Sequence, residues 1–187
     1  LAIVIGRRMR NVTANAAARY IFGYTSAQDI SDRTIQKAES QWARAKSFDT
    51  FTPLGPYVET KIDPHKLTIQ LFQNGQLRQN SLTGQLIFNC FELVSFISTN
   101  ITLLPGDVIL TGTPSGVGPI QSGDKLEVRI QGMQSNGNLS GYFCCHTLGL
   151  VAIERIPIQN AKLKEYNCKG TCCFAISTTY DVDSNGN

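Results

Sequence analysis

The sequence predicts a mainly β protein with two or three short helices, an α+β class of fold. Apolar and polar residues alternate over residues 67–71 and again over residues 126–130, as expected for strands with one buried face. Asn74-Gly75 follows the first of these runs, and this dipeptide is preferred in tight hairpin turns. Residues 86–97 instead carry apolar side chains at helical spacing, which predicts one amphipathic helix.

The remaining elements are shorter and are predicted from local composition. Residues 1–6 are an apolar run and predict a buried strand. An Ala-rich helix is expected over residues 14–21, with Gly23 at its end. Residues 24–30 are expected to be extended, followed by a turn or short helix. Residues 108–110 predict another buried strand, which leads into a loop rich in Thr, Gly and Pro.

Composition excludes several classes of function. The chain has 187 residues, 42% of them hydrophobic and 17% charged, which is typical of a globular domain. Its net charge of +3 is scattered, and the basic run at residues 7–10 has no interleaved aromatic residues, so nucleic-acid binding is not expected. No apolar run approaches the roughly 18 residues of a membrane helix, so no membrane association is expected.

The cysteines divide the chain into two parts. Five of the six lie after residue 140, so a tail of unknown structure is expected over residues 140–187, following a first domain over residues 1–139. The tail could bind zinc or act as a redox module, although its cysteines lack the usual Cys-x2-Cys spacing. The first domain has no secretory signal and is expected to be cytoplasmic, or mitochondrial if a targeting segment is missing.

A small group of polar residues forms the candidate site: Asp29, Arg33, Gln36 and Lys46. One acid, two cations and one amide can together hold a divalent cation and an anionic, oxygen-rich ligand. Taken singly, each has an ordinary alternative. Asp29 is compatible with a turn or with a helix cap, and Lys46 with an exposed surface position. Asp32 is an obvious local partner for Arg33 in a surface ion pair.

The loop at residues 110–119 reads Leu-Thr-Gly-Thr-Pro-Ser-Gly-Val-Gly-Pro. It lacks the Gly-Lys-Ser/Thr ending of a phosphate-binding loop, so a nucleotide site is not expected, and a plain turn-rich connection is the alternative. His65 precedes a predicted strand within a polar loop and is expected to face solvent.

Three blocks in this order, residues 23–36, 44–51 and 110–119, resemble the fumarylacetoacetate hydrolase family. The resemblance extends over about residues 1–132. It implies a mixed β-sandwich roll like the C-terminal domain of that family, usually assembled as a homodimer. It also implies that the domain over residues 1–139 lacks its N-terminal part, including a His-bearing lid and a Glu-x-Glu pair immediately before Leu1.

The resemblance gives each candidate residue a role. Asp29 would bind the metal, Mg²⁺ first, with Mn²⁺ or Ca²⁺ possible, and Lys46 would stabilise negative charge developing on the substrate. Arg33, Gln36 and Thr111 would bind substrate oxygens. Two features depart from the family pattern, because the acidic pair is absent and Thr34 stands where a second Asp is usual.

The implied reaction is metal-dependent chemistry on small 2-oxo acids or 1,3-dicarbonyls through a metal-stabilised enolate. The branch most similar to this chain contains acylpyruvases, oxaloacetate decarboxylases and 2-oxohepta-3-ene-1,7-dioate hydratase-isomerases. C–C cleavage, decarboxylation and isomerisation are therefore all open. The alternative is a non-catalytic, truncated remnant with an incomplete metal site.

Overall fold

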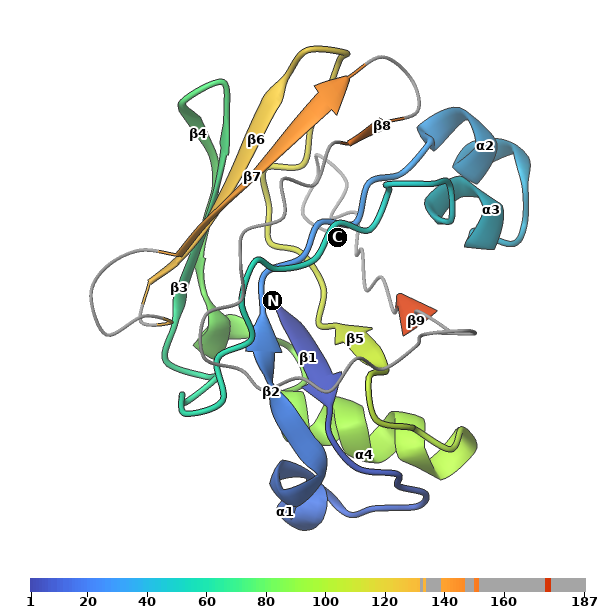
Figure 1. The fold of residues 1–187 in the computed structure, drawn as a ribbon. Helices are drawn as coiled ribbons and strands as arrows, with labels where there is room; N and C mark the ends of the chain where they lie inside the picture. Colours follow the sequence, from blue (N-terminus) through green and yellow to red (C-terminus); the bar gives the residue numbers. More distant parts are fainter. Residues whose placement is uncertain (132, 134–138, 147–149, 152–173, 176–187) are drawn as a thin grey trace, which may run out of the picture.

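The computed structural model describes residues 1–131, 133, 139–146, 150–151 and 174–175. These residues form two sheets with short helices at their margins, which confirms the predicted mainly β, α+β class (Figure 1). The smaller sheet has the strand order β2-β1-β5-β9, and only its β5–β9 pair is parallel. Its strands are β1 (Ala2–Ile5), β2 (Ile21–Thr25), β5 (Val108–Leu110) and β9 (Phe174–Ala175).

The larger sheet has the order β4-β3-β6-β7-β8 and is antiparallel throughout. The predicted hairpin is present, since Asn74 and Gly75 connect β3 to β4 with positive φ angles of 53° and 79°. The strands are β3 (Thr68–Gln73), β4 (Gln76–Leu82), β6 (Lys125–Gln131), β7 (Leu139–His146) and β8 (Leu150–Val151).

The helices are short, and the longest is the predicted amphipathic helix. That helix starts later than its apolar pattern, because Asn89 provides the N-cap and forms a capping box with Glu92. The predicted short helix carrying Arg33 and Gln36 is also present. The α-helices are α1 (Ala14–Ala17), α2 (Arg33–Ala38), α3 (Ala43–Lys46) and α4 (Cys90–Asn100), with single 3-10 turns at Ala18–Tyr20 and Thr83–Gln85.

The prediction for Gly23 was wrong. The helical segment ends at Tyr20, and Gly23 lies inside β2, paired with Val4 of β1. A Cβ atom at this position would lie 2.5 Å from the carbonyl oxygen of Glu59. Glycine is therefore required for the close approach of another backbone segment, and not to end a helix.

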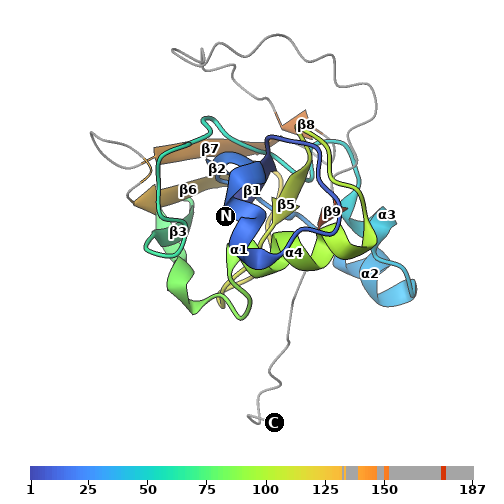
Figure 2. The ribbon, with the colours of Figure 1, turned by 90° about the horizontal axis from the view of Figure 1, so that it is seen from below.

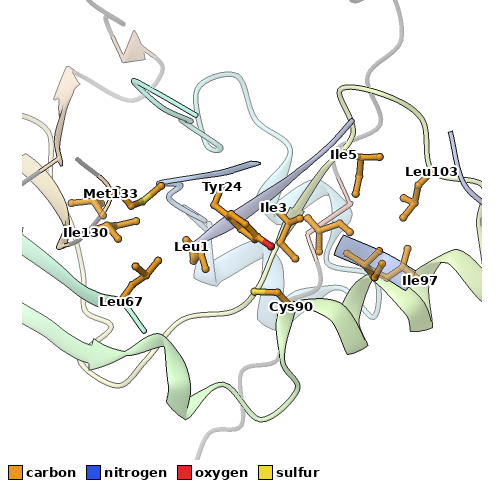
Figure 3. Close-up of a cluster of buried hydrophobic side chains, with 14 of the residues drawn as sticks. Leu1, Ile3, Ile5, Tyr24, Leu67, Cys90, Ile97, Leu103, Ile130 and Met133 are labelled. Carbon is orange, nitrogen blue, oxygen red and sulfur yellow. The ribbon is translucent and has the colours of Figure 1, made fainter. Parts of the chain in front are cut away.

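The two faces of β1 serve different purposes. Leu1, Ile3 and Ile5 are buried in the main core with α4 and the larger sheet (Figure 3). Ala2, on the opposite face, forms a second small cluster with Val108 and Leu110 of β5, and Ala27 and Leu54 pack against this cluster. Because side chains alternate along a strand, this second face looks toward the segment that carries Asp29. From below, α1 and α4 lie side by side against the first face (Figure 2).

The predicted boundary between residues 139 and 140 falls at the start of β7, which pairs with β6 along its length. The division into a domain and a tail stays a prediction. Most of the tail, including Cys168, Cys172 and Cys173, lies outside the described residues, so the zinc or redox hypothesis is not addressed by them. Within the described part, no helix has the length and apolar character needed to cross a bilayer.

Candidate active site

A cavity of about 1280 Å³ lies between the two sheets. One wall is formed by residues 27–31 with side chains from α2 and α3. The other is formed by β3, β4 and the loop over residues 112–120. Four of the five predicted site residues line it, namely Asp29, Arg33, Gln36 and Lys46. The structure thus gathers residues spread over two helices and a connecting segment into one space.

Asp29 and Lys46 form the centre of the first wall. The Lys46 ammonium donates to Asp29 Oδ2 at 2.5 Å, and their side chains are only 10% and 22% exposed, respectively. Lys46 is therefore a largely buried, paired residue and not the exposed surface lysine of the alternative interpretation. The backbone holds the two elements together, since the Asp32 N–H donates to the carbonyl of Ala45 at 2.9 Å.

Arg33 and Gln36 lie on one face of α2. Arg33 Nη1 donates to Gln36 Oε1 at 2.6 Å, so these two predicted substrate-binding residues are in contact. Asp32 does not form the ion pair with Arg33 that was considered as an alternative; it is the N-cap of α2 instead. Its Oδ1 accepts from the N–H groups of Thr34 and Ile35 and caps α2, which leaves Arg33 facing the cavity.

Three buried polar atoms in this wall have no hydrogen-bond partner among the described residues: Gln28 Nε2, Asp29 Oδ1 and Ser31 Oγ. An unsatisfied buried polar atom costs about 1–3 kcal/mol, so three within four residues need an explanation. All three residues line the cavity, where a polar ligand could satisfy them. Gln28 and Ser31 were missed from the sequence, because nothing in their local pattern indicates burial.

Thr111 takes a different position from the other four. Its backbone N–H and its hydroxyl both donate to the carbonyl oxygen of Leu1 at 3.1 Å, and the residue is buried. It lines a smaller cavity of about 130 Å³ beside the first one. Its neighbours Gly112 and Thr113 line both cavities. A direct contact of Thr111 with substrate stays a prediction.

The loop after Thr111 is fixed to β4. Gln79 Nε2 donates to Thr113 Oγ1 at 2.9 Å and to the carbonyl of Pro114 at 2.8 Å. Gly116 has a φ of +97°, and a Cβ atom there would overlap the carbonyl oxygen of Arg78. The loop is therefore a built wall of the cavity and not only a connection between strands.

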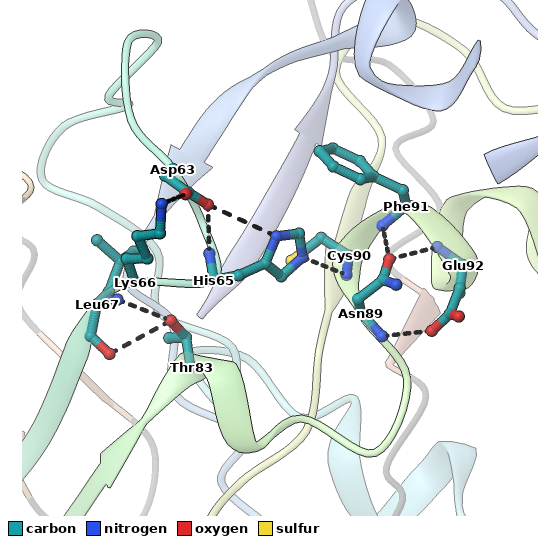
Figure 4. Close-up of polar contacts among 9 residues, drawn as sticks. All are labelled: Asp63, His65, Lys66, Leu67, Thr83, Asn89, Cys90, Phe91 and Glu92. Carbon is teal, nitrogen blue, oxygen red and sulfur yellow. Dashed lines mark hydrogen bonds and ion pairs between the residues drawn. The ribbon is translucent and has the colours of Figure 1, made fainter. Parts of the chain in front are cut away.

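His65 was expected to face solvent, but its side chain is mostly buried. Its side chain is 26% exposed, and Nε2 accepts a hydrogen bond from the backbone N–H of Cys90 at 3.1 Å (Figure 4). Burial raises the pKa of the Cys90 thiol to about 11, so this thiol is protonated near neutral pH. The pair is consequently a helix cap and not a nucleophile with its base.

The acidic residues available for a metal are few. Among the described residues, no group of three or more His, Cys, Asp or Glu side chains lies close enough to hold a metal ion. Asp29 Oδ1, buried and without a partner in that part of the chain, fits one position in the shell of a hard divalent cation. Such a cation also accepts water and substrate oxygens as ligands, so one carboxylate fits a part of a site.

Comparisons with known proteins agree with this geometry. The family model described as the fumarylacetoacetate (FAA) hydrolase C-terminal domain matches residues 1–139. A solved structure of 5-carboxymethyl-2-hydroxymuconate delta-isomerase from Mycobacterium smegmatis is 48% identical, with a TM-score of 0.71 over 74% of this chain and 54% of that chain. Maleylpyruvate hydrolase from Sphingobium sp. SYK-6 is 33% identical, with a TM-score of 0.67 over 75% and 50%.

A third relative is the mitochondrial oxaloacetate tautomerase FAHD2B of Bos taurus, which is 43% identical over 70% of this chain and 46% of its own length. The chain therefore belongs to the fumarylacetoacetate hydrolase family, and the prediction of an enzyme family is confirmed. The chain spans about half the length of the curated relatives it matches.

Proposed function

We propose that this chain carries the substrate pocket of a divalent-metal-dependent enzyme that acts on 2-oxo acids or 1,3-dicarbonyls. The reaction would be C–C hydrolysis, as for an acylpyruvate, or a related decarboxylation or isomerisation. The proposal is carried by the asymmetry of Asp29, whose Oδ2 is held by Lys46 while Oδ1 is buried without a partner among the described residues. A carboxylate in this state is prepared to accept a further ligand.

The described side chains suit an enolate chemistry. Arg33 offers a planar fork that matches a carboxylate, and Gln36 holds that fork in place. Lys46 presents a largely buried ammonium that would stabilise negative charge developing on a substrate oxygen. Asp29 would be one ligand of Mg²⁺, with Mn²⁺ or Ca²⁺ as substitutes, and the cation would polarise the substrate oxygens.

Calorimetry of Mg²⁺ binding to the 187-residue chain, with and without oxalate as a stand-in for a 2-oxo acid, tests this proposal. We expect oxalate to strengthen Mg²⁺ binding, and Asp29→Asn to abolish that effect. Asp49→Asn is the matched control, because it removes the same charge from an exposed position outside the cavity. Mg²⁺ binding that is equal in both variants would contradict the role of Asp29.

A non-catalytic remnant is the second candidate, and it is favoured because no group of three or more His, Cys, Asp or Glu side chains among the described residues could hold a metal ion. It predicts no heat of Mg²⁺ binding, with or without oxalate. An assay with an acylpyruvate separates the two further. Mg²⁺-dependent turnover that is lost in Lys46→Ala supports the enzyme, and turnover without metal contradicts it.

We also propose that the protein assembles as a homodimer, binds neither nucleic acid nor membranes, and acts in the cytoplasm or in the mitochondrion. Large apolar side chains at the N-terminal side and on the outer face of α4 support an assembly, because Ile87, Phe88 and Phe96 are 70%, 55% and 67% exposed. Sedimentation of the purified chain tests the dimer, and a monomer at all concentrations would contradict it.

A further inference from the structure

Arg78 occupies an unusual position in β4. The register between β3 and β4 shifts between Leu71 and Phe72, so that Leu71 pairs with Gln79 and Phe72 pairs with Leu77. Arg78 is the extra residue of the resulting β-bulge and has no partner in β3. Bulges of this kind redirect a side chain and are common beside active sites. Arg78 lines the large cavity, on the wall formed by β3 and β4.

The Arg78 guanidinium is available to a ligand. No hydrogen bond or ion pair engages it within the described part of the chain, and the residue is exposed. Asp124 is the acid whose charge it influences, and that carboxylate already accepts from the Gln121 N–H and from the amides of Gln73 and Asn74. Among the described residues, Arg78 is thus a cation that lines the cavity without an acid bound to it.

The backbone beneath this side chain is firmly held. Gly116 lies directly against the carbonyl of Arg78, and the neighbouring Gln79 anchors Thr113 and Pro114. A guanidinium on a fixed backbone loses less conformational freedom when it binds than one on a mobile loop. The bulge and the loop over residues 112–120 together therefore hold the backbone of Arg78 in a fixed position.

The charges of the cavity are divided between its two walls. Arg33, Lys37 and Lys46 come from the α2–α3 wall, where Asp29 neutralises one of them, and Arg78 comes from β4. In Figure 1 the β3–β4 hairpin and the α2–α3 pair lie on opposite sides of the strand that leads into the loop. A ligand with one carboxylate would use one wall only, whereas a ligand with two would use both.

We propose that Arg78 binds a second, distal carboxylate of the substrate, so that the cavity selects dicarboxylic 2-oxo acids over monocarboxylic ones. This inference rests on the proposed function, which places the 2-oxo acid group of the substrate at Asp29, Lys46 and Arg33. Arginine suits this task because its planar fork binds a carboxylate through two parallel hydrogen bonds. Arg78 is a specificity-determining residue and takes no part in the bond-breaking step.

The test compares two ligands that differ only at their far end, 2-oxoglutarate and 2-oxopentanoate, by calorimetry with the 187-residue chain in the presence of Mg²⁺. We expect the chain to bind the dicarboxylate about 10- to 100-fold more tightly, the range of a charge-assisted contact. Arg78→Gln should remove this preference and leave 2-oxopentanoate binding unchanged. 2-Oxoadipate, one carbon longer, tests whether the spacing of the walls favours a longer ligand.

Arg10→Gln is the matched control, since it removes an exposed cation outside the cavity and should preserve the preference. Arg78→Lys keeps the positive charge but lacks the planar guanidinium, so it should keep only part of the preference for the dicarboxylate. Equal binding of the mono- and dicarboxylates by the unmodified chain would overturn the inference and leave the proposed function standing. Binding of neither ligand would overturn both, and equal losses for both ligands in Arg78→Gln would overturn the specificity role.

Discussion

The imidazole Nε2 of His65 accepts a hydrogen bond from the backbone N–H of Cys90, the first residue of α4, at 3.1 Å. The next two N–H groups of the helix, those of Phe91 and Glu92, donate to the side chain of Asn89. A helix leaves its first N–H groups without intrahelical partners, and here a residue far along the chain completes the set. His65 therefore joins the loop before β3 to the main helix of the core.

Replacement of His65 is expected to loosen this junction. His65→Ala should lower the free energy of unfolding by about 1–2 kcal/mol, because it removes the acceptor and an edge-on contact with the Phe91 ring. His65→Phe keeps a ring and should recover part of the loss. Urea denaturation measures both, with the exposed Lys66→Ala as a control. A full recovery in His65→Phe would show that the hydrogen bond to Cys90 contributes nothing.

The Asp29–Lys46 pair predicts a second stability effect. Lys46→Met leaves the Asp29 carboxylate partly buried with no cation beside it, so we expect a loss of about 1–3 kcal/mol. In the double variant with Asp29→Asn the loss should be smaller than the sum of the two single losses. Urea denaturation of the four proteins gives the coupling. Strict additivity would show that the pair does not contribute to folding.

A second pair of variants provides the control for that cycle. Arg44 and Glu39 also form an ion pair in the same region, but on the exposed side of α2 and α3. Solvent screens such a pair, so Arg44→Met should cost clearly less than Lys46→Met. An equal cost would indicate that α3 responds to any loss of a cation, and not to the specific contact with Asp29.

Much of the fold is legible in the sequence because its signals are local. The alternation over residues 67–71 and 126–130 and the Asn74-Gly75 turn depend only on near neighbours, and each became the predicted element. Gly23 failed for the opposite reason. Its requirement comes from the backbone of Glu59, which is distant in sequence, and a helix end and a crowded strand both favour glycine.

The candidate site shows the same division. Asp29, Arg33, Gln36 and Lys46 were found through recognisable blocks, and the structure brings them to one cavity. Gln28, Ser31 and Arg78 were not found. The burial of the first two depends on how residues 27–31 pack, and the exposure of Arg78 to the cavity depends on a shift in strand register. The positions of all three side chains depend on tertiary packing, so the periodicity of the sequence does not predict them.

The turn of the β3–β4 hairpin predicts a pH effect through Asp124. Its carboxylate accepts hydrogen bonds from the Gln121 N–H and from the side-chain amides of Asn74 and Gln73. These bonds, the one from Gln121 above all, hold the pKa of Asp124 below its ordinary value. A carboxyl group whose pKa is lower in the folded state stabilises the fold above the ordinary Asp value of about 4. This contribution is lost as the pH falls through the folded value.

Asp124→Asn should therefore be less stable than the unmodified chain near neutral pH, and the difference should shrink as the pH falls below about 4. Thermal denaturation at a series of pH values measures this, with Asp49→Asn as an exposed-charge control. If the stability difference between the two proteins stays constant over the whole pH range, the effect comes from altered packing or hydrogen bonding and not from the ionised carboxylate.

The loop over residues 112–120 offers a paired glycine test of the cavity wall. Gly116 has a φ of +97° and lies against the Arg78 carbonyl, whereas a Cβ atom added at Gly118 in the same loop would meet no described atom within 4 Å. Gly116→Ala should cost about 1–3 kcal/mol and push the loop off β4, whereas Gly118→Ala should be nearly neutral.

Because the loop is also a wall of the cavity, Gly116→Ala should weaken the binding of 2-oxoglutarate as well as lower the stability. Gly118→Ala should leave both unchanged, so the two variants separate a local clash from a general effect of adding a methyl group to the loop. If both variants unfold at the same urea concentration, the close approach of Gly116 to Arg78 does not hold the loop in place. The argument that the loop fixes the backbone of Arg78 would then be contradicted.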